Sequence, residues 1–183
     1  MVWSDDLENS KDVFCKQATP ILKKLIGDFC FLPLEGTDEP VAKHMDKRCC
    51  IDYIIVKDGR SRGVASRLQH LPDYKSFTIR TSRDSGALTE FHKLNDAIKN
   101  KGLRPTYHVH GYVDDDGKIV SLAIMFTDEL MDYLNESIKF GNPAIRYRHT
   151  HDDKDGQAGF YACFWDDIKK KGYRVKVYPE DMT

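Results

Sequence analysis

The residues best placed for chemistry lie in the middle of the chain, and Asp52 is the first of them. It belongs to an apolar run, Ile51–Val56, that is typical of an internal strand. An acidic side chain in such a run is costly unless it binds a metal ion or a charged partner. Two roles therefore remain open for Asp52: it is a metal ligand, or it forms an ion pair with Arg67 or Arg80.

Glu90 and Lys93 are two further charged residues of this part of the chain. Two carboxylates in one site can hold Mg²⁺ or Mn²⁺, which polarises a phosphate and activates water, and a lysine beside them stabilises developing negative charge. The open alternative for Glu90 and Lys93 is a surface ion pair, because they stand three residues apart on a predicted helix.

A basic segment contains these residues. Between residues 57 and 104 there are eleven Lys and Arg against five Asp and Glu, although the whole chain has a net charge of −1. Arg67, Arg80 and Arg83 are the candidate nucleic-acid contacts, since a guanidinium can bind phosphate through two parallel hydrogen bonds. The net charge argues against a general nucleic-acid binder, but a locally basic face can hold an anion such as the phosphate of a nucleic acid; the open alternative is a solvated surface with scattered charges.

Hydrophobic periodicity places these residues on a mixed α/β framework. The pattern predicts two helices or one kinked helix around Pro20 over 11–29, and an irregular connection over 31–47. It predicts strands over 51–56, 63–69 and 76–80, and a helix over 87–100 capped by Asp84 or Ser85. It then predicts strands over 106–113 and 119–126, a helix from Thr127, strands over 144–149 and 159–164, a helix over 165–171 and a strand over 174–178. Asp58-Gly59 and the segment 114–117 predict hairpin turns. Because no linker or repeat is visible, residues 1–183 are expected to form one domain of the α/β (α+β) class.

The order of the first six elements, a helix, three antiparallel strands, a helix and a strand, resembles the core of the PD-(D/E)XK, or restriction-endonuclease-like, nucleases. The segment Asp46–Val56 resembles the first motif of that superfamily. The second motif, Glu/Gln-x-Lys, is replaced here by Arg67-Leu68-Gln69, with the cation and the amide in swapped order. The resemblance implies a restriction-endonuclease-like core, αβββαβ, with a C-terminal β/α extension of the mixed sheet. It also implies a metal site at Asp52 and Glu90, with Glu35 or Asp46 as the alternatives to Glu90. Catalysis would then depend on Asp52, Gln69, Glu90 and Lys93, with Gln69 as a weak ligand or a residue that positions water.

A rival constellation is His108-Val109-His110, whose two histidines face the same side of a predicted strand. This spacing suits two ligands of one metal ion and resembles the metal motif of HUH nicking endonucleases. Tyr133 is the available nucleophile, although the Tyr-x-x-Lys pattern is missing. The open alternative is a pair of strand residues on a partly buried face. Further candidates for a metal cluster lie near a predicted surface loop: His149, His151 and Asp153.

Composition limits the class of protein. The chain is 40% hydrophobic and 31% charged, which is ordinary for a globular protein and excludes wholesale disorder. No apolar run approaches the length of a membrane span, and the first residues do not resemble a secretory signal, so no membrane partner is expected. The five cysteines form no CxxC pair, and we interpret them as reduced thiols of a cytoplasmic protein rather than metal ligands beside His44.

The sequence thus predicts a cytoplasmic, nucleic-acid-processing protein, of the kind encoded by phages or mobile elements. Its expected activity is that of a Mg²⁺- or Mn²⁺-dependent phosphodiesterase, or nuclease, built on Asp52 and Glu90. Two alternatives remain open. One is a non-catalytic protein on the same fold that binds DNA, another nucleic acid or a protein. The other is an HUH-type nicking enzyme that uses His108 and His110.

Overall fold

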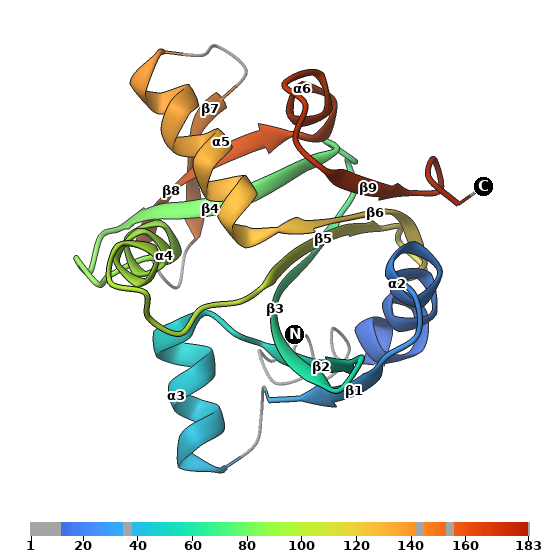
Figure 1. Ribbon diagram of the computed structural model, residues 1–183. Helices are drawn as coiled ribbons and strands as arrows, with labels where there is room; N and C mark the ends of the chain where they lie inside the picture. Colours follow the sequence, from blue (N-terminus) through green and yellow to red (C-terminus); the bar gives the residue numbers. More distant parts are fainter. Residues whose placement is uncertain (1–11, 35–37, 142–144, 153–155, 183) are drawn as a thin grey trace.

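A curved mixed sheet forms the centre of the computed structural model (Figure 1). Its strands follow the order β1 (Cys30–Pro33), β2 (Tyr53–Lys57), β3 (Arg60–His70), β5 (Tyr107–Val113), β6 (Ile119–Phe126) and β9 (Val175–Tyr178). All neighbours are antiparallel except β3 and β5, which are parallel. The structure describes residues 12–34, 38–141, 145–152 and 156–182, and for 145–152 and 156–157 it describes the backbone alone.

A second sheet and the helices cover the first sheet on both faces. The second sheet has the order β4 (Ser76–Arg83), β8 (Gly156–Phe164) and β7 (Ile145–Asp152). The helices are α2 (Thr19–Ile26), preceded by the π-helical segment η1 (Phe14–Ala18), then α3 (Pro40–Cys49), α4 (Glu90–Lys99), α5 (Thr127–Lys139) and α6 (Trp165–Lys170). This arrangement confirms the predicted mixed α/β class.

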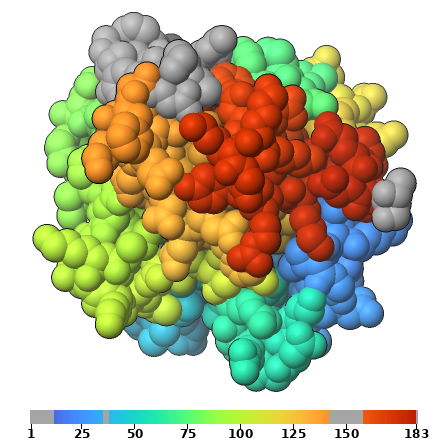
Figure 2. Space-filling model, turned by 45° about the horizontal axis from the view of Figure 1, so that its top comes forward, coloured from blue at the N-terminus to red at the C-terminus, as the bar shows by residue number. Residues whose placement is uncertain are grey.

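Each face of the six-stranded sheet supports its own hydrophobic core, because successive strand residues point to opposite sides. On β5, Val109 and Val113 face the N-terminal segments η1 and α2, where Phe14 stacks on Tyr53 with ring centroids 4.3 Å apart. Tyr112 faces the other core, which includes residues of α4, α5, α6 and the second sheet. Figure 2 shows residues of α5 and of the C-terminal segment, in orange and red, covering one side of the molecule.

The two hairpin turns form where the sequence predicts them. Asp58 and Gly59 connect β2 to β3 with φ angles of 51° and 67°, and Lys57 pairs with Arg60. Two central residues with positive φ are the requirement of a type I′ turn, which matches the twist of the flanking strands. The second turn connects β5 and β6, and there the amide of Gly117 donates to the carbonyl of Asp114.

The prediction of an irregular connection over 31–47 is wrong, because this segment contributes to β1 and contains most of α3. Both elements are largely exposed and therefore lack hydrophobic periodicity: on α3 only Ala42 is buried. Pro40 at the start of α3 is the signal that marks it, since proline is favoured in the first turn of a helix. Pro20 falls in the first turn of α2, directly after η1, so the helical segment changes from π-helix to α-helix beside the proline.

Three local expectations near the site differ from the structure. Asp52 lies immediately before β2, which begins at Tyr53, rather than inside the strand. The helix expected over 87–100 begins at Glu90 and its N-cap is Thr89, not Asp84 or Ser85. The strand β4 pairs with β8 in the second sheet, whereas the neighbour of β3 on its other edge is the parallel strand β5.

Candidate functional site

A polar cavity of about 210 Å³ lies between the six-stranded sheet, β4, the end of α3 and the start of α4. Its lining carries charged side chains and two histidines: Asp46, Asp52, Arg67, Arg80, Arg83, Glu90, Lys93, His108 and His110. Of the residues expected in the nuclease-like site, Asp52, Arg67, Arg80, Arg83, Glu90 and Lys93 therefore converge on one place. Gln69 does not line the cavity, and its side chain instead contacts His110.

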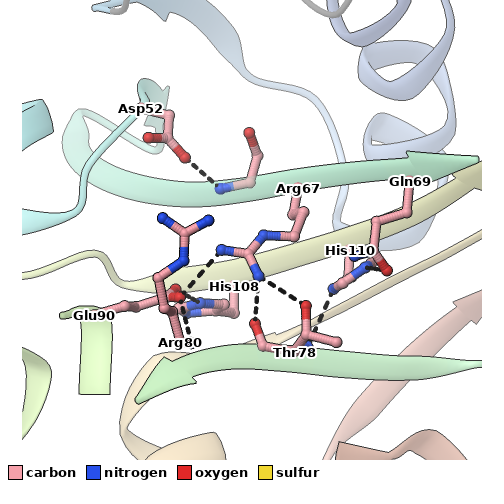
Figure 3. Close-up of polar contacts among 9 residues, drawn as sticks. Asp52, Arg67, Gln69, Thr78, Arg80, Glu90, His108 and His110 are labelled. Atoms are coloured by element: carbon pink, nitrogen blue, oxygen red, sulfur yellow. Dashed lines mark hydrogen bonds and ion pairs between the residues drawn. The ribbon is translucent and has the colours of Figure 1, made fainter. Parts of the chain in front are cut away.

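The parallel pairing of β3 with β5 creates one wall of this cavity. Arg67 is the Cα partner of His110, and Ala65 is the partner of His108. Because side chains alternate along each strand, Arg67, Gln69, His108 and His110 all project to the same face. The strand β4 runs across this face and supplies Thr78 and Arg80, as Figure 3 shows.

Glu90, the first residue of α4, links four elements through its carboxylate (Figure 3). One oxygen, Oε1, accepts a hydrogen bond from Nε2 of His108 at 2.8 Å. The other, Oε2, lies 3.4 Å from Nη2 of Arg67 and accepts a hydrogen bond from the backbone amide of Arg80 at 3.3 Å. The side chains of Glu90 and Arg67 are only 15% and 28% exposed, so this ion pair is largely withdrawn from water.

The pKa of Glu90 reflects these contacts. Burial alone would raise it, but the charge of Arg67, the hydrogen bond and charge of His108 and the amide of Arg80 together lower the pKa to about 2. Glu90 is therefore ionised at any pH near neutrality.

His110 is held in one neutral form by its neighbours. Its Nδ1 accepts a hydrogen bond from the backbone amide of Thr78 at 3.3 Å, which leaves the proton on Nε2 to be donated to Oε1 of Gln69 at 3.1 Å. Burial, together with the positive charge of Arg67, lowers the pKa of His110 well below its ordinary value. The imidazole ring thus adds no charge to the cavity.

Arg67 and Arg80 lie against a common aromatic ring. Nη1 of Arg67 donates to the carbonyl oxygen of Thr78 at 3.2 Å and to its hydroxyl at 2.8 Å. The guanidinium carbons of Arg67 and Arg80 are 5.6 Å and 5.3 Å from the ring centroid of Phe160, on β8. In Figure 3 the Arg80 side chain extends from β4 toward β3 and the side of the cavity where Asp52 lies.

Asp52 lies immediately before β2 and is held against β3 by two hydrogen bonds. Its amide donates to the carbonyl of Val64, and its Oδ2 accepts a hydrogen bond from the amide of Ser66 at 2.6 Å. Asp46 approaches the same cavity from the last turns of α3, and burial raises the pKa of its carboxyl. On the same side of the cavity, Lys93 connects α4 to α3, because its Nζ donates to the carbonyl of Lys47 at 2.5 Å.

The expected magnesium ligands are only partly suited to that role. Both oxygens of Glu90 accept hydrogen bonds, and the nearby guanidinium of Arg67 would repel a cation. The amide oxygen of Gln69 is taken by His110. Within the described ranges, no cluster of three or more His, Cys, Asp and Glu is placed to hold a metal ion, and Glu35 lies outside those ranges. Glu90 therefore fits the role of an ion-pair partner better than that of a metal ligand.

The geometry gives little support to an HUH-type site at His108 and His110. Both ring nitrogens of His108 have partners, Glu90 and Thr127, as do both ring nitrogens of His110. The ring of Tyr133 does not line the cavity, but contacts Tyr173 in the core, and burial raises its pKa to about 12. The remaining candidates for a metal cluster, namely the side chains of His149 and His151 and all of Asp153, lie outside the described residues.

The histidines and the acids, assigned to rival sites by sequence reasoning, therefore belong to one cavity. Sequence reasoning could not relate them because the parallel β3–β5 contact spans more than forty residues of the chain, as in the pair Arg67 and His110. Phe160 was missed for a similar reason, since it reaches the arginines only through the β4–β8 pairing. The one available signal was the pattern of polar side chains at alternate positions on β3 and β5.

Comparison with known proteins adds no family to this description: no family model, no curated protein and no solved structure matches the chain. Among the described residues, no helix is long and apolar enough to cross a membrane.

Proposed function

We propose that this cavity binds a phosphate group of a nucleic acid and that the protein acts in nucleic-acid processing. The observation that carries the proposal is the convergence of four cationic side chains, those of Arg67, Arg80, Arg83 and Lys93, on one small polar cavity. Guanidinium and ammonium groups are the protein's usual phosphate ligands.

The size of the cavity favours a single phosphate group. Pockets for drug-sized molecules usually measure about 300–1,000 Å³, whereas this cavity measures about 210 Å³. A phosphate fits within such a volume while the attached sugar and base remain outside. The exposed Arg83 at the rim of the cavity would meet the nucleic acid first, and the half-buried Arg67 and Arg80 would contact the phosphate further in.

The balance of charge supports an anion as the ligand. Four cationic side chains and three carboxyl groups line the cavity, so the cations outnumber the carboxyl groups by one. One of the three, Glu90, is already engaged by Arg67 and His108. An anion that enters a partly desolvated, positively charged cavity gains more electrostatic energy than it would at an exposed surface.

Phosphodiester cleavage is the second candidate, and the position of two acids favours it. Asp52 and Asp46 line the same cavity as the cations, so carboxylates and phosphate contacts would face one substrate. This candidate retains the restriction-endonuclease-like core as a proposal, with the β2–β3 hairpin, α4 and β5 as its central part and β6, α5 and β9 as its extension. Mg²⁺ or Mn²⁺ would then be supplied with the substrate.

The test of the first proposal is a binding titration with fluorescent single-stranded DNA, double-stranded DNA and RNA at several salt concentrations. We expect Arg83→Ala and Lys93→Ala each to weaken binding and to reduce the salt slope by about one, the value for one lost phosphate contact. The matched control is Lys99→Ala on the same helix, because Lys99 does not line the cavity. Absence of binding at low salt, or an equal effect of Lys99→Ala, would contradict the proposal.

The second candidate is tested by incubating the same nucleic acids with Mg²⁺ or Mn²⁺ and analysing the products. Cleavage that disappears in Asp52→Asn supports a metal-dependent phosphodiesterase, since the substitution keeps the shape of the side chain and removes its charge. Cleavage that persists in Asp52→Asn excludes Asp52 as its acid. If the wild-type protein binds nucleic acid without cutting it, the protein is a binding protein on this fold.

A further inference from the structure

Phe160 occupies an unusual place beside the cavity. It is the Cα partner of Arg80 across the β4–β8 pairing, and it is partly buried. Its ring centroid lies 5.3 Å from the guanidinium carbon of Arg80 and 5.6 Å from that of Arg67. Both distances fall within the range of about 6 Å over which an aromatic ring attracts a cation. One ring therefore contacts two of the four cations of the cavity.

The orientation of Arg67 has two further determinants. Its Nη1 donates both to the carbonyl and to the hydroxyl of Thr78, and its Nη2 contacts Glu90. A guanidinium has five N–H donors, so these bonds leave donors available for a ligand. The ring of Phe160 restricts the plane in which those donors lie.

The guanidinium groups of Arg67 and Arg80 lie against the same ring, and two like charges in a half-buried site are only partly screened from each other. Glu90 offsets part of the charge of Arg67, and an anion that contacts both groups would add to this neutralisation. The two cations are thus in place before a phosphate binds. This is the property expected of a preorganised anion site.

We propose that Phe160 is a positioning residue of the cavity, whose ring holds the guanidinium groups of Arg67 and Arg80 so that both contact the same phosphate. The inference rests on the proposed function. Phe160 itself needs no contact with the ligand, and its effect is transmitted through the two arginines. Without the ring the charges remain, but Arg67 is held only by Thr78 and Glu90, and the ligand must supply the rest of the ordering of both side chains.

The test compares Phe160→Leu, which removes the ring, with Phe160→Tyr, which keeps it. The matched control is Phe126→Leu, because Phe126 is also half-buried and carries a single guanidinium, that of Arg174, at 5.2 Å, away from this cavity. With a fluorescent single-stranded oligonucleotide, we expect Phe160→Leu to bind about five- to tenfold more weakly, the loss of two cation–π contacts. Phe160→Tyr and Phe126→Leu should stay within about twofold of the wild type.

A second measurement is independent of any ligand. In the free protein, NMR signals of the Arg67 and Arg80 Nε–H groups should report restricted side chains in the wild type and in Phe160→Tyr, and more mobile ones in Phe160→Leu. Thermal unfolding checks that each variant is folded. Equal binding and equal guanidinium mobility in folded Phe160→Leu overturn the inference. A wild-type protein that binds no oligonucleotide but shows this change in mobility refutes the proposed function and leaves the positioning role of Phe160 standing.

Discussion

Replacing Glu90 with Gln keeps the shape of the side chain and removes the charge at the centre of the cavity network. The carboxylate has a pKa of about 2 where its ordinary value is 4.5, which corresponds to about 3 kcal/mol of preferential stabilisation of the ionised form in the folded protein. Breaking a buried ion pair typically costs about 3–5 kcal/mol. Because Arg67 is 28% exposed, we expect Glu90→Gln to lower the free energy of unfolding by about 3 kcal/mol at pH 7, the lower end of this range.

The effect of Glu90→Gln must depend on pH in a defined direction. The pKa of Glu90 is lower in the folded than in the unfolded protein, so the unfolded state takes up a proton first as the pH falls. The stability that Glu90 contributes is therefore complete above about pH 5 and is lost as the pH falls toward 2. The difference in unfolding free energy between wild type and variant should decrease to about 1 kcal/mol at pH 3.

Urea titrations of both proteins at pH 7 and pH 3, followed by circular dichroism, measure this difference directly. The control is Glu180→Gln. The hydrogen bonds from Lys75 and Lys169 also lower the pKa of Glu180, but its side chain is 41% exposed. Surface ion pairs contribute at most about 1 kcal/mol, so Glu180→Gln should change stability little. If Glu90→Gln costs no more than Glu180→Gln at pH 7, or if its cost is the same at pH 3, then Glu90 is not the centre of a buried charge network.

Two further predictions concern packing and thiol chemistry. A Cβ atom on Gly63 would lie 3.0–3.1 Å from three atoms of the buried Ile51, so Gly63→Ala should destabilise the protein by about 1–3 kcal/mol; an unchanged melting temperature would contradict this. Burial raises the pKa of the Cys163 thiol to about 12, whereas Cys15 and Cys30 are exposed. Iodoacetamide at pH 8 should therefore label Cys15 and Cys30 in the native protein long before Cys163, as peptide mass spectrometry can show.

The elements with clear periodicity could be predicted from the sequence. The strand expected over 119–126 coincides with β6, and both hairpin turns occur where Asp-Gly pairs predict them. These features depend on local preferences, on β-branched residues in alternation and on glycine at positive φ. The edge strand β1 and the helix α3 were missed because their residues are mostly exposed and carry no hydrophobic pattern.

The candidate site was predicted in its residues but not in its arrangement. Asp52, Arg67, Arg80, Glu90 and Lys93 do line one cavity. Their roles could not be assigned from the sequence, because the role of each charge depends on its neighbours in space. Glu90 illustrates this: on a helix pattern it suits a surface pair or a metal ligand, and only the β3–β5 contact brings Arg67 and His108 to its two oxygens.

The arrangement of the two sheets explains why Glu90 pairs with an arginine in this cavity. The strand β4 leaves β3 and joins β8, so the face of β3 and β5 that carries Arg67 and His110 is covered by the backbone of β4. A covered face cannot leave a guanidinium without a partner, and Glu90 provides one at the start of α4. Because Glu90 forms an ion pair with Arg67, the charge at the entrance of the cavity is set by the other cations, above all Arg83 and Lys93. Under the proposed function, the topology that pairs Glu90 with Arg67 leaves Arg83 and Lys93 to meet the phosphate first.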